Sequence, residues 1–266
     1  MNREQRIQTA QETVNISNAG YYILNTKNTK IALADGLKST RINIEQLKNE
    51  HFNGGKYTPT YNVVPKTVSD TLANEIPSSE LVGILNFASA KNRGGGFLKG
   101  SLAQEEALCI CSNLYIAQLL VKDYYDINSK TKNGLYTDEM FVTNNVTFFR
   151  DDKTYKLYEN PIVVKSVVTA PAVNLGHKIT SFTQARTVML NRIRLVIKAF
   201  ATEQVTTLIL GAWGCGVFKN NPVDIAQDFK LVLMNENLGS YFKNIYFAIP
   251  QSSKNNNFIA FKNIFS

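Results

Sequence analysis

The chain has 266 residues, 44% of them hydrophobic, which suffices for one large buried core or for a core with an extension. Its formal net charge of +8 favours an anionic partner, while no apolar run approaches the roughly 20 residues of a membrane helix. The polar start, the 3 cysteines and the 2 histidines argue against a signal peptide, a disulfide framework and a zinc site. The composition therefore predicts a cytoplasmic globular protein with reduced thiols and no metal.

The beginning of the chain lacks a regular rhythm. Residues 3–13 predict an amphipathic helix, residues 13–34 alternate as strands do, and residues 39–65 predict irregular structure or short edge elements. We expect residues 1–70 to form an accessory extension. It would pack on a core of residues 71–266, and the whole would be one compact unit.

From residue 68 onward, strands and helices alternate. Short runs rich in Val, Ile, Thr and Phe predict strands over residues 81–88, 140–149, 162–170, 205–210 and 244–249. Apolar residues at helical spacing predict helices over residues 68–74, 102–121, 181–203 and 221–234. Ser181 with Gln184 predicts a capping box, and Asn221 before Pro222 predicts a helix start. This alternation predicts an α/β fold with helices on both faces of the sheet.

Two glycine-rich loops each follow a predicted strand and precede a predicted helix. They span residues 92–100 and 211–218. Loops at the carboxyl ends of strands bind ligands in α/β proteins, and helix N-termini offer unpaired N–H groups to anions. Neither loop fits the P-loop or the dinucleotide fingerprint. A single such loop can be a mere tight turn, but two of them predict a cradle for a diphosphate.

A pair of carboxylates, Glu105 and Glu106, opens the helix after the first loop. Acids are common at helix N-termini and often face solvent, so a structural role stays open. Neighbouring helical residues point about 100° apart, so the two cannot flank one glycosidic bond from opposite sides. We expect one glutamate to transfer a proton while the other holds sugar hydroxyls. The loops and the acids together predict chemistry on a phosphorylated sugar.

Aromatic residues lie within or near these loops. Phe97 and Phe218 could stack on a base or ribose, or tuck into the core behind their loops, and both possibilities stay open. Tyr136 and Phe141 are weaker candidates for the same role.

These segments, in this order, resemble the signature of bacterial-type poly(ADP-ribose) glycohydrolases. The resemblance rests on the run Asn-Phe-Ala-Ser-Ala at residues 86–90, then Asn92, the triple glycine Gly94 to Gly96 and the run Gln104-Glu105-Glu106. It is supported by residues 135–138, 149–152, 169–174 and 211–218, and it extends from about residue 13 to residue 249. It implies an α/β fold, namely a macrodomain-like three-layer α/β/α arrangement with a mixed central sheet and an N-terminal accessory extension.

The resemblance also implies an activity and its partners. The activity is cleavage of ribose–ribose O-glycosidic bonds in poly(ADP-ribose), from the chain end, with release of ADP-ribose and without a cofactor or metal. The partners are poly(ADP-ribose) or ADP-ribosylated proteins. Nucleic acid is not required, no membrane is involved, and the protein is expected to be a monomer.

The resemblance assigns roles to matched residues. Glu106 would protonate the departing ribose oxygen and then activate water, while Glu105 and Asn92 would position the ribose. Backbone N–H groups would bind the diphosphate, Phe218 would pack on the ligand, and Phe97 would shape the pocket. The remaining substrate-binding positions come from the same two loops and the helix start. The expected N–H donors are those of Gly95, Gly96, Gly214, Cys215 and Gly216. The other expected substrate-binding residues are Gly94, Gln104 and Val217.

The chain departs from the family pattern at three places. Many members have proline at the position of Arg93, alanine at that of Ser101 and arginine at that of Ile110. None of these changes removes the acid, but substrate scope stays open. Two alternatives share the pocket: a hydrolase of mono-ADP-ribosyl groups, and a module that binds ADP-ribose without cleaving it. The intact acid pair argues against the second.

Overall fold

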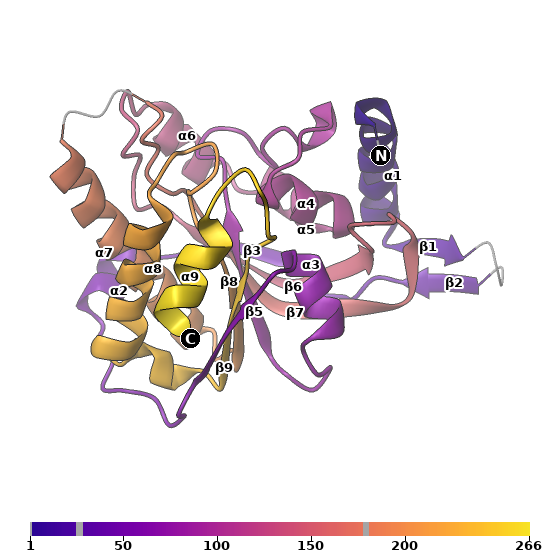
Figure 1. The fold of residues 1–266 in the computed structure, drawn as a ribbon. Helices are drawn as coiled ribbons and strands as arrows, with labels where there is room; N and C mark the ends of the chain where they lie inside the picture. Colours follow the sequence, from indigo (N-terminus) through magenta and orange to yellow (C-terminus); the bar gives the residue numbers. More distant parts are fainter. Residues whose placement is uncertain (1, 25–28, 178–180) are drawn as a thin grey trace.

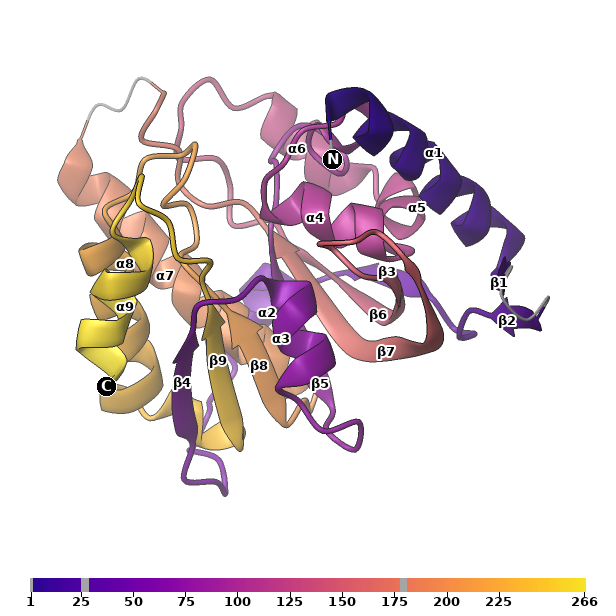
Figure 2. The ribbon, with the colours of Figure 1, turned by 45° about the vertical axis from the view of Figure 1, so that its right-hand side comes forward.

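The computed structural model describes residues 2–24, 29–177 and 181–266, and its centre is a seven-stranded sheet. The strand order is β3-β6-β7-β5-β8-β9-β4 (Figures 1 and 2). The β3–β6 and β6–β7 pairs are antiparallel and the others are parallel, so the sheet is mixed, as expected. Its strands are β3 (Lys38–Arg41), β4 (Thr60–Val64), β5 (Val82–Phe87), β6 (Phe141–Arg150), β7 (Leu157–Ala170), β8 (Thr207–Leu210) and β9 (Asn244–Ala248).

Helices cover both faces of this sheet (Figure 2). One face packs on α1 (Arg3–Ala19), α3 (Val68–Asn74), α4 (Gln104–Cys111) and α5 (Leu114–Leu119). The other packs on α2 (Ile44–Asn49), α7 (Phe182–Thr202), α8 (Pro222–Lys230) and α9 (Asn257–Phe265). The expected three layers are therefore present. Shorter elements are α6 (Asp123–Ser129), η1 (Phe97–Lys99), η2 (Leu231–Asn235) and η3 (Leu238–Tyr241).

The central strand β5 explains why the site lies where it does. Its side chains alternate between the two cores, with Ile84 packing toward α3 and α4 and Leu85 packing toward α7. Because β5 pairs in parallel with β7 and β8, it is buried on both faces, which accounts for its nearly continuous apolar run. Its carboxyl end therefore lies in the middle of the sheet edge where α/β proteins place ligands.

The helix predicted over residues 102–121 is wrong as a single element. It is broken into α4 and α5 at Ser112 and Asn113, which bind the neighbouring strand β6 instead. Ser112 forms an isolated bridge with Phe148. Asn113 donates its backbone N–H to the Thr147 oxygen (3.3 Å) and accepts the Thr147 N–H with its side chain (2.9 Å). These bonds to a partner distant in the chain replace the helical ones, so the helix stops.

The N-terminal part is more regular than expected. Helix α1 runs to Ala19, where Gly20 caps it with φ 74°, and the strands predicted over residues 13–34 begin only at β1 (Tyr21–Leu24). β1 pairs with β2 (Thr29–Ala32) in a separate hairpin; residues 25–28 of that prediction lie outside the described residues. Helix α2 was not anticipated.

The extension shares the central sheet. Strands β3 and β4 come from residues before 71 and form the two edges of the main sheet, as the short edge elements expected there. The division of the chain at residue 70 into an extension and a core therefore stays a prediction about folding units. A test would ask whether one part folds without the other.

Most of the later elements match expectation. At the start of α7, Ser181 accepts the Gln184 N–H (3.2 Å), which is one half of the predicted capping box; the described residues show no return bond from the Gln184 side chain. At the start of α8, Asn221 accepts the Val223 N–H (2.9 Å), as expected. Helices α6 and α9 were missed. In the described part of the chain, no helix combines the length and apolar character needed to cross a membrane.

Candidate active site

The two glycine-rich loops meet at the carboxyl edge of the sheet. They follow β5 and β8, which are hydrogen-bonded neighbours. Gly211 packs so closely on the end of β5 that an added Cβ would lie 3.1 Å from the Phe87 ring. The structure therefore brings together the two segments that the sequence marked as a diphosphate cradle.

Glu105 is buried in a ring of N–H donors. Its Oε2 accepts the Ser89 N–H (2.7 Å), and its Oε1 accepts the side-chain amides of Gln118 (3.0 Å) and Asn86 (3.3 Å). Burial raises the pKa of Glu105 to about 8, and the charge of Glu106 acts in the same direction, against the donors. The side chain is thus held in one orientation and retains a proton near neutral pH.

Glu106 is held by the first loop itself. Its Oε1 accepts the Gly96 N–H (2.8 Å), and its Oε2 accepts the Ala103 N–H (3.0 Å). Both carboxylates face Gly95, where an added Cβ would lie 2.5 Å from Glu106 Oε1 and 3.2 Å from Glu105 Oε2. Although the two residues diverge at the helix surface, their carboxylates converge on one point of the loop. With φ 58°, that point favours glycine for its backbone as well.

The N–H groups of the first loop are largely engaged within the protein. Gly95 donates to the Asn92 oxygen (3.0 Å), and Gly96 donates to Glu106. The expectation that both glycines donate to a diphosphate therefore stays a prediction, one that requires these bonds to open. In this structure the loop is folded tightly around the acid instead.

The second loop has the opposite character. Of its expected donors, Cys215 donates to the Ala212 oxygen (3.1 Å). The N–H groups of Gly214, Gly216, Val217 and Phe218 have no acceptor among the described residues. Gly214 has φ 75°, and Val217 is 80% exposed at the rim. Neighbouring N–H groups that lack acceptors within the described part of the chain are the arrangement that favours a bound anion, so the expectation of a diphosphate at this loop stays a prediction.

The remaining predicted residues divide between the site and the core. Gln104 accepts the Phe87 N–H (2.9 Å) and donates to the Leu85 oxygen (2.7 Å), so it ties α4 to β5, and its substrate contact stays a prediction. Asn92 is exposed beside the glycines. Phe97 is buried with its ring 5.1 Å from that of Tyr115, which is the core alternative.

The aromatic candidates divide in the same way. Phe141 is buried with Tyr124 and Tyr125. Phe218 is half-buried, with its ring centre 6.1 Å from that of Tyr136. These two rings therefore remain the ones placed beside the second loop.

Sequence reasoning missed the residues that hold the first loop from outside. Arg6 donates to the Gly100 oxygen (2.8 Å) and Arg3 donates to the Lys99 oxygen (3.0 Å), so α1 holds the turn η1 between the glycines and the acids. Gly100, with φ 71°, allows this approach. Nothing in the local sequence signals contacts between residues 94 and 96 positions apart. Among the described residues, no group of three or more His, Cys, Asp or Glu is arranged to hold a metal ion.

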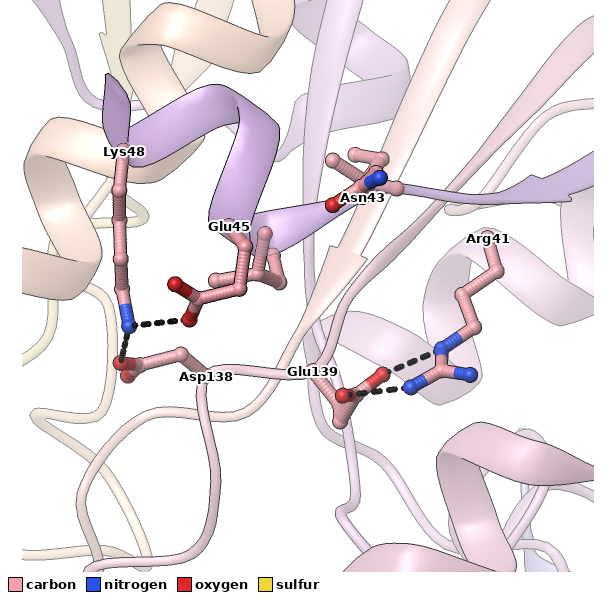
Figure 3. Close-up of a pocket in the computed structure, with 8 residues that line it drawn as sticks. Arg41, Asn43, Glu45, Lys48, Asp138 and Glu139 are labelled. Carbon is pink, nitrogen blue, oxygen red and sulfur yellow. Dashed lines mark hydrogen bonds and ion pairs between the residues drawn. The ribbon is translucent and has the colours of Figure 1, made fainter.

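Away from the glycine-rich loops, a hollow of about 530 Å³ lies where β3 meets the start of β6 (Figure 3). Its charged side chains are paired with one another. Arg41 binds Glu139 through two bonds of 2.6 and 2.7 Å, and Lys48 lies 3.4 Å from Glu45 (Figure 3). The positive charges of this hollow are therefore already paired with carboxylates. In this it differs from the second glycine loop, whose N–H donors have no acceptor among the described residues.

Comparisons with known proteins agree with this geometry. The family model of the microbial-type PARG catalytic domain, where PARG stands for poly(ADP-ribose) glycohydrolase, matches residues 10–151. The chain is similar to a PARG structure from Thermomonospora curvata bound to the inhibitor ADP-HPD, with 28% identity, a TM-score of 0.86 and coverage of 98% of this chain and 99% of that one. It is also similar to a PARG from Deinococcus radiodurans in complex with ADP-ribose, with 32% identity, a TM-score of 0.75 and coverage of 87% and 94%. No curated protein matches the chain.

Proposed function

We propose that Glu106 is the catalytic acid of this protein, which belongs to the microbial-type PARG family and is a poly(ADP-ribose) glycohydrolase. One observation carries the assignment of the acid. The Glu106 carboxylate is fixed by two loop N–H groups and converges with buried Glu105 on Gly95. At the same edge, a neighbouring loop presents N–H donors that have no acceptor among the described residues. A ligand with its diphosphate on the second loop would have its sugar beside the acids.

The reaction uses Glu106 twice. In its acid form it donates a proton to the ribose oxygen that leaves with the rest of the polymer, and the glycosidic C–O bond breaks to give an oxocarbenium-like ribose. The resulting carboxylate then takes a proton from a water molecule as the water oxygen bonds to the anomeric carbon. ADP-ribose is released with the acid restored. Glu105, held by three donors, orients the adjacent ribose hydroxyls.

The second loop and the aromatic residues beside it bind the rest of the terminal unit. The N–H groups of Gly214, Gly216 and Val217 would donate to the diphosphate, and Phe218 with Tyr136 would contact the nucleoside. Cleavage from the chain end follows if the crevice holds one unit at a time. Monomeric state, cytoplasmic location and preference for polymer over a single ADP-ribosyl group stay predictions.

The test is product analysis on automodified poly(ADP-ribose), without added metal. We expect the wild type to release free ADP-ribose and Glu106→Gln to lose roughly 10³-fold or more in rate, because the amide cannot donate an acidic proton. Glu106→Gln should still bind ADP-ribose in calorimetry, since its shape is kept. Glu45→Gln, an exposed glutamate outside the site, is the matched control. Turnover of Glu106→Gln within tenfold of the control would refute the assigned role.

A further inference from the structure

A second hollow adjoins the first glycine loop and differs in charge from the one in Figure 3. It measures about 280 Å³, and none of its lining residues is acidic. Three of them are cations, and we call it the basic hollow. It is lined by Lys91, Asn92, Arg93, Gly95, Gly96, Leu98, Lys99 and Tyr115. A cationic concavity with no internal counter-charge favours a bound anion.

Arg93 is held in place before any ligand arrives. Its Nη2 donates to the Val121 oxygen (3.3 Å), and its guanidinium carbon lies 4.5 Å from the centre of the Tyr125 ring. No carboxylate pairs with Arg93 or with Lys99 in the part of the chain that the structure describes. A guanidinium oriented by packing loses less conformational entropy when it binds phosphate. Arg93 is thus preorganised, and its charge is available to an anion.

The basic hollow lies where the polymer beyond the scissile bond would continue. Tyr115 belongs to α5, which packs on β6 and β3, whereas the second glycine loop follows β8 on the other side of β5. The hollow and the second loop therefore flank the first loop from opposite sides. A terminal unit bound between the two loops would have its scissile bond at Gly95, and the remaining polymer would continue past Gly95 and Gly96. Both glycines line the hollow.

We propose that the basic hollow binds the diphosphate of the second ADP-ribose unit, the one that leaves when the terminal unit is cleaved, through Arg93 and Lys99. The proposal rests on the proposed function. It makes the hollow a subsite that distinguishes polymer from a single unit. A substrate that lacks a second diphosphate would not use it.

The experiment compares Arg93→Gln, Lys99→Gln and the double variant with wild type, on two ligands. For polymer hydrolysis we expect kcat/KM to fall roughly tenfold in the double variant because KM rises. Its neutral side chains bind the second diphosphate more weakly. The dependence of log KM on log salt should become shallower by about 0.7 for each phosphate that a variant no longer neutralises. For free ADP-ribose, Kd in calorimetry should change less than about twofold, since that ligand has no second diphosphate.

A matched control removes the same charge elsewhere. Lys230→Gln changes an exposed lysine at the end of α8, outside both glycine loops. If both single variants and the double variant have the polymer KM and salt slope of Lys230→Gln, the proposal is overturned. An equal reduction of ADP-ribose affinity would also overturn it, because the hollow would then serve the terminal unit.

A failure of the proposed function can be distinguished from a failure of the proposal for the basic hollow. If wild type releases no ADP-ribose, polymer binding measured by fluorescence polarisation in wild type and the same variants still tests the hollow. Weaker polymer binding in Arg93→Gln and Lys99→Gln than in Lys230→Gln would support it, and equal binding would overturn it.

Discussion

The two glycine-rich loops look alike in sequence and have different roles in the structure. In the first, the Gly95 and Gly96 N–H groups are engaged inside the protein, and Gly96 donates to Glu106. In the second, the N–H groups of Gly214 and Gly216 have no acceptor among the described residues. The first loop is bonded to the Glu106 carboxylate, whereas the N–H groups of the second are the donors that we propose for the ligand. Glycine content alone therefore does not say whether a loop binds phosphate, because the partners of its N–H groups decide that.

The largest effect is expected from adding a methyl group to the first loop, at Gly95. Gly95→Ala would place a Cβ 2.5 Å from Glu106 Oε1 at a residue with φ 58°. The carboxylate must move, so we expect kcat on polymer to fall roughly 10²-fold, the scale of a misplaced catalytic group. The Kd for ADP-ribose, measured by calorimetry, should change only a few-fold. A variant with normal kcat would show that the close approach of Gly95 and Glu106 is unimportant.

The corresponding change in the second loop should have the reverse profile. Gly214→Ala would bring a Cβ to 2.5 Å from Asn220 Nδ2 and 2.7 Å from the Ala172 Cβ, with φ 75°. The loop must shift, so we expect ADP-ribose affinity to fall roughly tenfold, because one or two charge-assisted hydrogen bonds no longer form. The turnover rate at saturating substrate should fall less. The control is Gly216→Ala, whose Cβ would meet nothing within 4 Å, and its Tm is compared with that of Gly214→Ala.

The buried acid Glu105, which opens α4 after the first loop, should make the stability of the protein depend on pH. Burial raises the pKa of Glu105 from 4.5 to about 8, so between these values the folded protein binds a proton that the unfolded chain releases. Stability from this group is present below the lower value and is lost as pH rises toward about 8, by at most about 1.4 kcal/mol per pH unit. The Tm of Glu105→Gln minus that of wild type should therefore increase from pH 5 to pH 8. A difference that is constant with pH, or that decreases, would contradict the buried, protonated state.

The smallest effect is expected where α1 holds the first loop. Arg6→Ala removes the bond to the Gly100 oxygen (2.8 Å), which lies between the glycines and the acids. We expect kcat to fall a few-fold and the free energy of unfolding to drop by about 1.5–3 kcal/mol, the range for a hydrogen bond that involves a charged group. Arg6→Lys, which can still donate, should recover part of kcat. Equal kcat in all three proteins would show that α1 does not position the loop.

The sequence predicted what local patterns determine. The apolar run of β5, the two glycine loops, the caps at Ser181 and Asn221, and the acid pair at the start of α4 are all read from neighbouring residues. The resemblance to a family supplied the mixed sheet. These features place the candidate site at the carboxyl edge of the sheet, where its assignment stays a prediction.

The sequence could not predict what distant partners determine. The break between α4 and α5 depends on Thr147, and the bond from Arg6 to Gly100 joins residues 94 positions apart. The unequal roles of the loops have the same origin. Gly96 donates to Glu106, while the Gly216 N–H has no acceptor among the described residues. Both facts depend on the folded geometry, which the spacing of the glycines does not encode.

The most direct test of this division of roles is an amide-resolved NMR titration of glycine-labelled protein with inorganic pyrophosphate, followed by ADP-ribose. Pyrophosphate has no sugar, and the titration uses the Arg93→Gln, Lys99→Gln double variant, in which the basic hollow beside Gly95 and Gly96 has lost two of its cations, so that it reports on the phosphate cradle of the second loop. We predict that the Gly214 and Gly216 amides shift with pyrophosphate, while the Gly95 and Gly96 amides, engaged inside the protein, respond mainly to ADP-ribose. Shifts with pyrophosphate at Gly95 and Gly96 and none at Gly214 and Gly216 would contradict the account.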